Sequence, residues 1–358
     1  MSVLSDIAAE VKDDVRAVAQ TPVEAIKDAR YTLDGIREGR VSAASVAKTA
    51  GVTAGAVVVV ALLLFPLYWV AVGAFSGTGA SLYSSSGIRL WPSDPTIRPF
   101  LWVVGDIIVP SYRITFGLGG YELFVQTPKL ALLDVSNYGV TETSNFKKFF
   151  VNSLTVAIPT VLLAMSLIVP GAYALSRRKF IGRSKILYGY VLFTQIGGGL
   201  GVALLIALYA LFVQYGFNDN KLALSAYYAA TAVPFNTWLL KTYMDGIPVS
   251  YEEAAMMDGA PSWKIVTEII LPLSKAGLAT VFIFTFLTGW TEFVVAQTLL
   301  STDNYTLPVG LYSLVGRYSI PWARFSAFAL TFAAPIMLIY LFAQRYIEGG
   351  LSFGGMEG

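Results

Sequence analysis

The chain has 358 residues, of which 55% are apolar and 13% are charged, and its formal net charge is +2. The charged fraction is well below the roughly 25% of ordinary soluble domains, which favours a membrane protein, and the small net charge gives no support to nucleic-acid binding. The absence of cysteine and histidine excludes disulfides, thiol catalysis, imidazole acid–base catalysis and most zinc sites. Few enzyme classes remain.

The first 48 residues are predicted to form a cytoplasmic N-terminal extension. Val11, Val15 and Val18 recur at helical spacing, which predicts an amphipathic helix that breaks near Pro22. A solvated tail that lies on the lipid headgroups fits the same composition equally well.

Six apolar segments are each long enough to cross a bilayer. A hydrocarbon core about 30 Å thick requires about 20 helical residues, and a helix satisfies its own backbone hydrogen bonds in lipid. The sequence therefore predicts an all-α, polytopic bundle of six transmembrane helices. The predicted spans are residues 51–75, 149–175, 186–213, 222–240, 276–299 and 325–344.

Basic residues in the short loops set the predicted orientation. Five of them lie between the second and third spans: Arg177, Arg178, Lys179, Arg183 and Lys185. The loop between the third and fourth spans has a single base, Lys221. Because Lys and Arg accumulate in cytoplasmic loops, the sequence predicts a multi-pass plasma-membrane protein with both termini in the cytoplasm.

The spans divide the rest of the chain into four predicted parts. Residues 49–75 form the first transmembrane helix, and residues 76–145 form a long extracytoplasmic loop rich in Tyr, Trp, Gly and Pro. We expect this loop to be an ordered cap, with a mostly flexible excursion as the alternative. Residues 146–346 hold the other five spans, and residues 347–358 form a Gly-rich cytoplasmic tail.

The most informative pattern lies in residues 247–274, between the fourth and fifth spans. Ser250 followed by Glu253 predicts a capping box that starts a helix, and Gly259 is suited to a left-handed C-cap that ends it. Pro261 can then begin a second helix. A compact helix–turn–helix on the cytoplasmic face indicates a docking element for another protein.

Residue spacing predicts two faces of this helix–turn–helix. The small residues Ala254 and Ala255 are expected on the surface of the first helix, where they would permit close approach of a partner. Four apolar residues of the second helix are expected along one side, which ends near Pro272. They are Trp263, Val266, Ile270 and Leu273.

The same segment resembles the coupling loop, or EAA loop, of binding-protein-dependent ABC permeases. The family pattern is Glu-Ala-Ala, three residues, Gly, nine residues, then Ile, any residue and Leu-Pro. The chain meets this pattern without insertion at Glu253, Ala254, Ala255, Gly259, Ile269, Leu271 and Pro272. Asp258 next to Gly259 is similar to the sugar-importer branch of the family.

The resemblance extends from about residue 146 to the C-terminus. Residues 152–154 and 171–183 are similar to the same permeases. Gln195, Thr291-Glu292 and residues 304–310, 343–345 and 349–355 are similar to the smaller permease of maltose-type importers. The chain departs from the family at Lys275-Ala276, where a proline usually follows the first residue. That departure leaves the resemblance of the coupling loop intact.

The resemblance implies a type I ABC importer permease fold and a role in sugar import, with maltose, maltodextrin or trehalose as the expected substrates. It also implies three partners: a second homologous permease, an ATPase dimer and an extracytoplasmic sugar-binding protein. No Gly-x4-Gly-Lys-Ser/Thr sequence occurs, so we expect no cofactor in this chain and ATP with Mg in the partner ATPase. A permease for a monosaccharide or glycerol phosphate is the alternative.

A secondary transporter is a more remote alternative, since it would need inverted repeats or an intramembrane charge relay. The predicted spans contain one ionisable residue, Glu292. This carboxylate can line the sugar path, pair with another subunit or lie near the outer headgroups. Gln195 and Asn236 are further candidates for the path, although polar residues between helices more often bind one another.

Glu253 also has two interpretations. Taken alone, it can simply cap a helix. The family resemblance instead implies that it faces a groove on the ATPase.

Overall fold

The computed structural model describes residues 42–77, 83–84, 87–88, 90–92, 94–109, 113–118, 121–126, 130–199, 201–316 and 320–354. The amphipathic helix predicted near Val11 and its break at Pro22 lie outside these residues. The chain divides into two compact units, Met1–Trp69 and Val70–Gly358.

The first unit contains most of helix α2 (Ala43–Ala74), which corresponds to the first predicted span. The helix is 32 residues long and includes Pro66 without an interruption. Its apolar character extends along its length rather than along one face, as expected for a helix that lipid surrounds.

Four helices among the described residues are long and apolar enough to cross a membrane. They are Ala44–Ala74, Phe146–Arg177, Lys275–Leu299 and Trp322–Gln344. They correspond to the first, second, fifth and sixth predicted spans, so length and composition confirm four of the six. The other two differ from the prediction for separate reasons.

The third predicted span consists of two helices, α5 (Arg183–Gly199) and α6 (Gly201–Gln214). Gly201 has a φ of +42°, a conformation that glycine adopts far more readily than other residues. The fourth predicted span is α7 (Lys221–Asp245), which has 25 residues but contains Ser, Thr, Tyr and Asn that lower its hydropathy.

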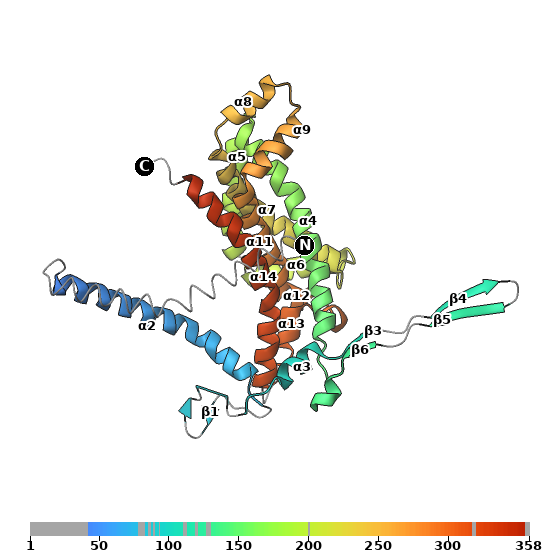
Figure 1. Ribbon diagram of the computed structural model, residues 1–358. Coiled ribbons are helices and arrows are strands. Elements are labelled where there is room, and N and C mark those ends of the chain that lie inside the picture. The colour runs from blue at the N-terminus through green and yellow to red at the C-terminus, as the bar shows by residue number, and fades with distance from the viewer. Residues whose placement is uncertain are drawn as a thin grey trace. The chain divides into compact units, whose positions relative to one another are not determined.

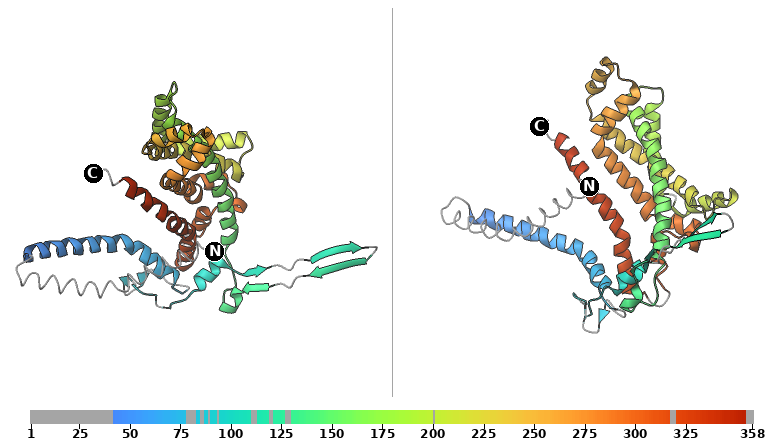
Figure 2. Two further views of the ribbon diagram at one scale, coloured as in Figure 1. Left: turned by 45° about the horizontal axis from the view of Figure 1, so that its top comes forward. Right: turned by 45° about the vertical axis from the view of Figure 1, so that its right-hand side comes forward.

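The second unit is built around three helices that lie side by side, α4 (Phe146–Arg177), α7 and α11 (Lys275–Thr291) (Figure 1). Helix α14 (Trp322–Gly354) packs on α11, and its helical structure continues past the end of the last predicted span into the Gly-rich segment. The views in Figure 2 show the same arrangement of these helices. Helix α13 (Leu307–Tyr312) packs against α4, α11 and α14.

Aromatic side chains fill much of the core where α4, α11 and α14 meet. The rings of Phe286 and Trp290 stack with centroids 5.3 Å apart, and Phe146 contacts Phe328 edge-on at 4.9 Å. The buried indole of Trp290 also donates a hydrogen bond to the carbonyl of Phe332 at 3.3 Å. These rings fix α14 against α11 and α4, since aromatic pairs add geometric preference to burial.

Two glycines of α11 permit close helix packing. A Cβ at Gly289 would lie 2.9 Å from the Cα of Ala157 in α4, and one at Gly277 would lie 2.7 Å from the Cγ of Tyr243 in α7. Both distances are shorter than real Cβ contacts. Small residues at helix contacts are the usual means by which membrane helices approach one another closely.

The all-α prediction is wrong for the segment between α2 and α4. Besides α3 (Arg98–Val104) and a short 3-10 helix (Val135–Tyr138), the described residues of this segment form three antiparallel strand pairs. They are β1 (Tyr83–Ser84) with β2 (Gly87–Ile88), β3 (Ile107–Val109) with β6 (Leu130–Leu133), and β4 (Arg113–Leu118) with β5 (Tyr121–Gln126). Glycines separate β4 from β5 in the sequence, and such dipeptides favour hairpins.

Candidate functional site

Residues 247–274 connect α7 to α11 and form a helical segment that we call the elbow. It consists of α8 (Ser250–Met257), α9 (Ser262–Ile265), the π-helical turn η2 (Val266–Ile270) and α10 (Leu271–Leu273). The elbow lies at the opposite end of the bundle from α3 (Figure 1). The predicted helix–turn–helix is therefore present.

The turn between α8 and α9 depends on Gly259, which has a φ of +79°. Its N–H donates to the carbonyl of Met256, and the N–H of Ala260 donates to the carbonyl of Ala255, both at 3.0 Å. This hydrogen-bond pair is the Schellman motif. The predicted left-handed C-cap is thus confirmed. Because a Cβ at Gly259 would meet no atom within 4 Å, glycine is favoured by its backbone conformation rather than by lack of space.

The predicted capping box at Ser250 and Glu253 is wrong. Helix α8 has Val249 as its N-cap, and no side chain caps it. The N–H groups of Glu252 and Glu253 donate to the carbonyl of Val249 at 2.9 and 3.1 Å. The turn that begins at Pro248 extends the helical backbone by one residue, so Ser250 already lies inside the first turn.

The outward face of the elbow is largely apolar. Met257 and Trp263 are 89% and 67% exposed, and Tyr251 and Met256 are also exposed. Glu253, Ala254, Asp258 and Gly259 are exposed on the same segment. A cluster of exposed large apolar side chains outside the transmembrane helices is typical of a protein interaction site.

Two predictions about the faces of the elbow need correction. Ala255 is buried instead of lying on the surface, and Ile270 is fully buried whereas Trp263 and Leu273 are exposed. The π-helical turn begins after Trp263 and ends at Ile270, and its additional residue shifts Ile270 around the helix axis relative to Trp263. The buried side of α9 and η2 therefore starts at Ile265.

The buried face of the elbow packs on the ends of three long helices. Ala255, Ile265 and Ile270 belong to one apolar cluster with residues of α4, α7 and α11. The members from the long helices include Ala172, Leu240, Met244 and Val281. The elbow is thus attached to the bundle by contacts as well as by chain connectivity.

An ion pair lies beneath the elbow. The Nε of Arg177, at the end of α4, is 2.5 Å from the Oε1 of Glu252, and the two side chains are 9% and 7% exposed. The other carboxylate oxygen of Glu252 accepts a hydrogen bond from the hydroxyl of Tyr173 at 3.2 Å. Arg177 also donates through Nη2 to the carbonyl of Ile247 at 2.7 Å. Three chain segments therefore meet at one buried pair of opposite charges.

Sequence reasoning selected Glu253 and missed Glu252. The spacing to Ala255 could have indicated it, because Glu252 and Ala255 are three residues apart and lie on one helix face. That face turns toward the bundle, whereas Glu253 turns away from it. The partner of Glu252 could not be identified from the sequence, since Arg177 is one of five nearby bases.

The structure places two of the three candidates for the sugar path in polar contacts. Glu292 follows the end of α11, accepts from the N–H groups of Val295 (3.0 Å) and Ala296 (3.2 Å), and accepts a hydrogen bond from the hydroxyl of Tyr228. It therefore satisfies N–H groups in the first turn of the short helix α12 (Val294–Leu299), which continues the predicted fifth span after a break at Glu292-Phe293.

Asn236 is buried in α7. Its Nδ2 donates to the carbonyl of Ala232 in the same helix at 2.9 Å, while Oδ1 has no hydrogen-bond partner among the described residues. Polar residues of membrane helices more often bond to a neighbouring helix. Among the described residues, the Asn236 side chain instead bonds within its own helix. Gln195 lies in α5.

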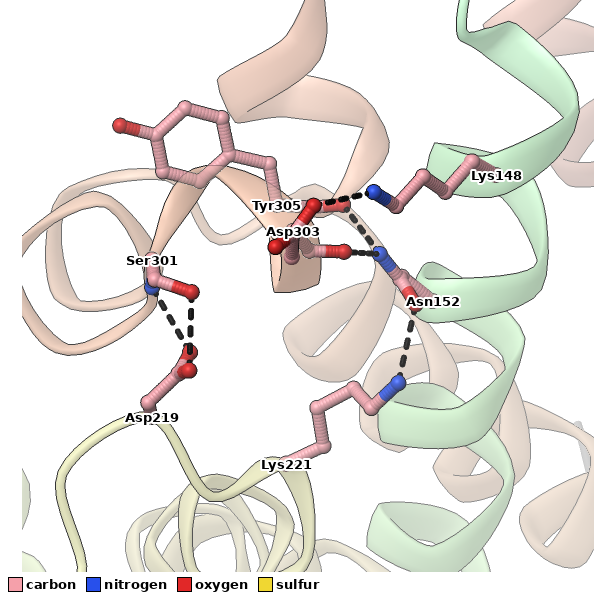
Figure 3. A network of polar contacts seen from close by, with 7 residues as sticks. All are labelled: Lys148, Asn152, Asp219, Lys221, Ser301, Asp303 and Tyr305. Carbon is pink, nitrogen blue, oxygen red and sulfur yellow. Dashed lines mark hydrogen bonds and ion pairs between the residues drawn. The ribbon is translucent and has the colours of Figure 1, made fainter.

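A polar network at the opposite end of the bundle joins the loop before α7 to the segment before α13 (Figure 3). The carboxylate of Asp219 accepts hydrogen bonds from the N–H and the hydroxyl of Ser301, both at 2.8 Å. Asp219 also has a left-handed backbone, with a φ of 58°. Asn304 Nδ2 donates to its carbonyl at 3.3 Å.

Burial alone would raise the pKa of Asp219, but hydrogen bonds from Ser301 and Asn304 outweigh it and lower the pKa below its ordinary value. The charged carboxylate therefore stabilises this loop at neutral pH. The pKa of Asp219 is lower in the folded than in the unfolded state. The stabilisation is therefore lost as the pH falls through the folded-state pKa.

Asn152 extends the network into α4 (Figure 3). Its Nδ2 donates to the carbonyls of Asp303 at 3.0 Å and Tyr305 at 3.1 Å, and its Oδ1 accepts from the Nζ of Lys221 at 2.9 Å. Lys148 forms an ion pair with Asp303 at 2.5 Å. The first turns of α4 and α7 are thereby held to the same short segment.

Comparison with known proteins connects these features to one family. The family described as "Binding-protein-dependent transport system inner membrane component" matches residues 149–352. The maltose/maltodextrin transport system permease protein MalG of Vibrio parahaemolyticus is 37% identical over 287 residues, which cover 75% of this chain and 96% of that protein. The galactooligosaccharides transport system permease protein GanQ of Bacillus subtilis is 32% identical over 266 residues, which cover 73% of this chain and 90% of that protein.

A solved structure has the same fold. The crystal structure of a bacterial ABC transporter involved in the import of the acidic polysaccharide alginate superposes with a TM-score of 0.63 at 19% identity and covers 86% of this chain and 98% of that one. The elbow, the apolar helices and these relatives lead to one conclusion. The chain belongs to the binding-protein-dependent transport system inner membrane component family and is a multi-pass plasma-membrane permease subunit of a carbohydrate ABC importer.

Proposed function

We propose that the chain carries oligosaccharides of the maltose, maltodextrin or trehalose kind across the membrane by alternating access, driven by a separate ATPase. The observation that carries this proposal is the elbow, a compact helical segment with an apolar outward face and a buried face seated on three long helices. The names of MalG and GanQ support oligosaccharides over monosaccharides or glycerol phosphate, which remain the alternative substrates.

In this proposal the elbow docks on the ATPase. Four of its exposed residues would lie at the interface, together with the side chain of Met257. They are Glu253, Ala254, Asp258 and Gly259. Ala255 would support the docking face from beneath. ATP and Mg would be bound by the ATPase dimer, and this chain would bind neither.

The elbow would act on α11 as a lever. Ile269, Leu271 and Pro272 belong to the consecutive η2 and α10 turns that lead into α11. Closure of the ATPase dimer would move the elbow, tilt α11 and shift the population from an inward-open to an outward-open arrangement. A second permease subunit would complete the cavity, and an extracytoplasmic binding protein would deliver the sugar.

The proposed topology has six membrane crossings and both termini in the cytoplasm. Helices α5 and α6 together would form the third crossing and α7 the fourth. The elbow would then face the cytoplasm, and residues 76–145 would face the outside. Residues 1–48 would form a cytoplasmic extension, residues 49–75 the first crossing, residues 146–346 the permease domain and residues 347–358 a cytoplasmic tail.

Among the candidates for the sugar path, Glu292 has the strongest support. It lies at the break between α11 and α12, and interrupted helices provide polar backbone groups at transporter binding sites. Asn236 has a buried carbonyl oxygen without a partner among the described residues, which could accept from a sugar hydroxyl when the helices separate. Gln195 is retained as a candidate from its position in α5.

Uptake by right-side-out vesicles that contain the whole importer, with ATP inside and the binding protein outside, tests this function. Uptake of maltose or maltodextrin is expected to require ATP and the binding protein, and to continue when a protonophore collapses the proton gradient. A secondary transporter would give the opposite pattern, with uptake that survives ATP depletion and stops with the gradient. That pattern would refute the proposal.

A further inference from the structure

We propose that Glu252 and Arg177 are positioning residues that couple the elbow directly to α4, so that motion of the elbow reaches α4 as well as α11. This inference rests on the proposed function, because it assumes that the ATPase moves the elbow. It assigns roles to two residues on the protected side of the elbow, away from the docking face.

The pair joins two helices that are far apart in the sequence. Glu252 belongs to α8, the part of the elbow farthest along the chain from α11, and Arg177 is the last residue of α4. The chain connects α8 to α11 through α9 and α10, but α8 and α4 are far apart in sequence. The 2.5 Å contact between Arg177 and Glu252 therefore creates a connection that the backbone does not provide.

Further hydrogen bonds support the pair. Tyr173 donates to Glu252 from one turn earlier in α4, and Arg177 donates to the carbonyl of Ile247, where the elbow begins. The two contacts of Glu252 join α8 to two positions of α4. Such a connection resists both translation and rotation of α8 relative to the end of α4.

The pair is also buried. Both side chains are at least nine-tenths buried, so water screens their attraction much less than it screens a surface pair. The apolar cluster that contains Ala172 and Ala255 lies beside them and joins the same two helices. A displacement of α8 that left α4 in place would have to separate two buried charges, which is far more costly than moving the helices together.

The elbow also contains a natural control. Lys264 and Glu268 form an i,i+4 ion pair at 3.7 Å on the surface, with side chains that are 48% and 57% exposed. This pair lies within the elbow and connects it to no other helix. Its loss should affect neither coupling nor assembly, since exposed pairs contribute little.

The test compares Glu252→Gln with Glu268→Gln in the whole importer, reconstituted in vesicles. The two measurements are ATPase co-purification and sugar molecules imported per ATP hydrolysed. Glu252→Gln is expected to retain the ATPase and its hydrolysis but to lower sugar imported per ATP about tenfold, within the 5–150-fold range of typical coupling free energies. Glu268→Gln is expected to match the unaltered importer.

A second variant covers the case in which the single substitution prevents folding. Arg177→Cys with Glu252→Cys removes both charges, which is tolerated better than an unpaired buried charge. The chain contains no other cysteine. A short bifunctional linker that a reductant can cleave would join the two thiols. The linked form is expected to import about tenfold more sugar per ATP than the cleaved form, which is a typical size for a coupling effect.

The outcomes separate the inference from the proposed function. Normal import per ATP in Glu252→Gln, or a double-cysteine variant whose coupling is the same with and without the linker, would overturn the role of the pair. If the unaltered chain imported sugar without ATP and without any ATPase, the proposed function itself would fail.

Discussion

Replacing Gly259 by valine is expected to lower ATP-driven uptake about tenfold or more while leaving membrane insertion intact. The φ of +79° at this position costs a non-glycine residue roughly 1–2 kcal/mol, and more if it is β-branched. About 1.4 kcal/mol corresponds to a tenfold change in population. The Schellman turn would therefore be depopulated, and the docking face of the elbow with it. Uptake and ATPase co-purification measure the effect.

Gly259→Asn is the matched control for this substitution. Asparagine tolerates the left-handed conformation much better than valine, and a Cβ at this position meets no atom of the chain within 4 Å. The asparagine variant is expected to lose much less uptake than the valine variant. Equal uptake by the valine variant and the unaltered protein would show that the turn has no role in coupling.

Replacing Gly289 by alanine is expected to destabilise the bundle. The added Cβ would lie 2.9 Å from the Cα of Ala157 and 3.2 Å from the Cβ of Thr160. Backbone atoms cannot move aside as a side chain can, so α11 and α4 must separate. Overpacking of this kind costs about 1–3 kcal/mol, which should appear as a lower unfolding temperature of the purified importer in detergent and as reduced uptake.

Gly189→Ala provides the comparison for this prediction. Gly189 lies in α5, and a Cβ there would meet nothing within 4 Å. Alanine is the better helix former, so the Gly189 variant is expected to be at least as stable as the unaltered protein. If both alanine variants unfolded at the same temperature, the close contact of α11 with α4 would not limit stability.

Local signals in the sequence were enough to predict the elbow. Gly259 was identified from its residue type alone, because few other residues adopt its conformation, and Pro261 marked the start of the next helix, where it is the N-cap of α9. The predicted capping box was wrong because Ser250 can be either the N-cap or the first residue of the helix. Only the backbone turn at Pro248 decides between them.

Hydropathy predicted the helices better than their interruptions. Apolar length located α4, α11 and α14, but the average over 20 residues concealed the break after Thr291. At that break the carboxylate of Glu292 accepts hydrogen bonds from the N–H groups of Val295 and Ala296 in the next helix. In the sequence the same carboxylate could equally be interpreted as a path-lining residue.

The sequence alone could not predict contacts between residues that are far apart in the chain. The pairing of Arg177 with Glu252 joins residues from two distant helices, and no local pattern distinguishes Arg177 from the bases around it. Likewise, the length of an apolar segment, which identifies membrane spans, does not indicate the strand pairs between α2 and α4. The alternation with a period of two that marks strands requires a different test.

The most direct test of the account is to ask whether the elbow touches a nucleotide-binding partner. The chain has no natural cysteine, so Met257→Cys places a single thiol on the outward face, and Asp303→Cys, 87% exposed at the other end of the bundle, is its control. The account predicts that a thiol- and amine-reactive linker joins Met257→Cys, but not Asp303→Cys, to a protein that a photoreactive ATP analogue also labels. Adducts of Met257→Cys that never carry the nucleotide label would contradict it.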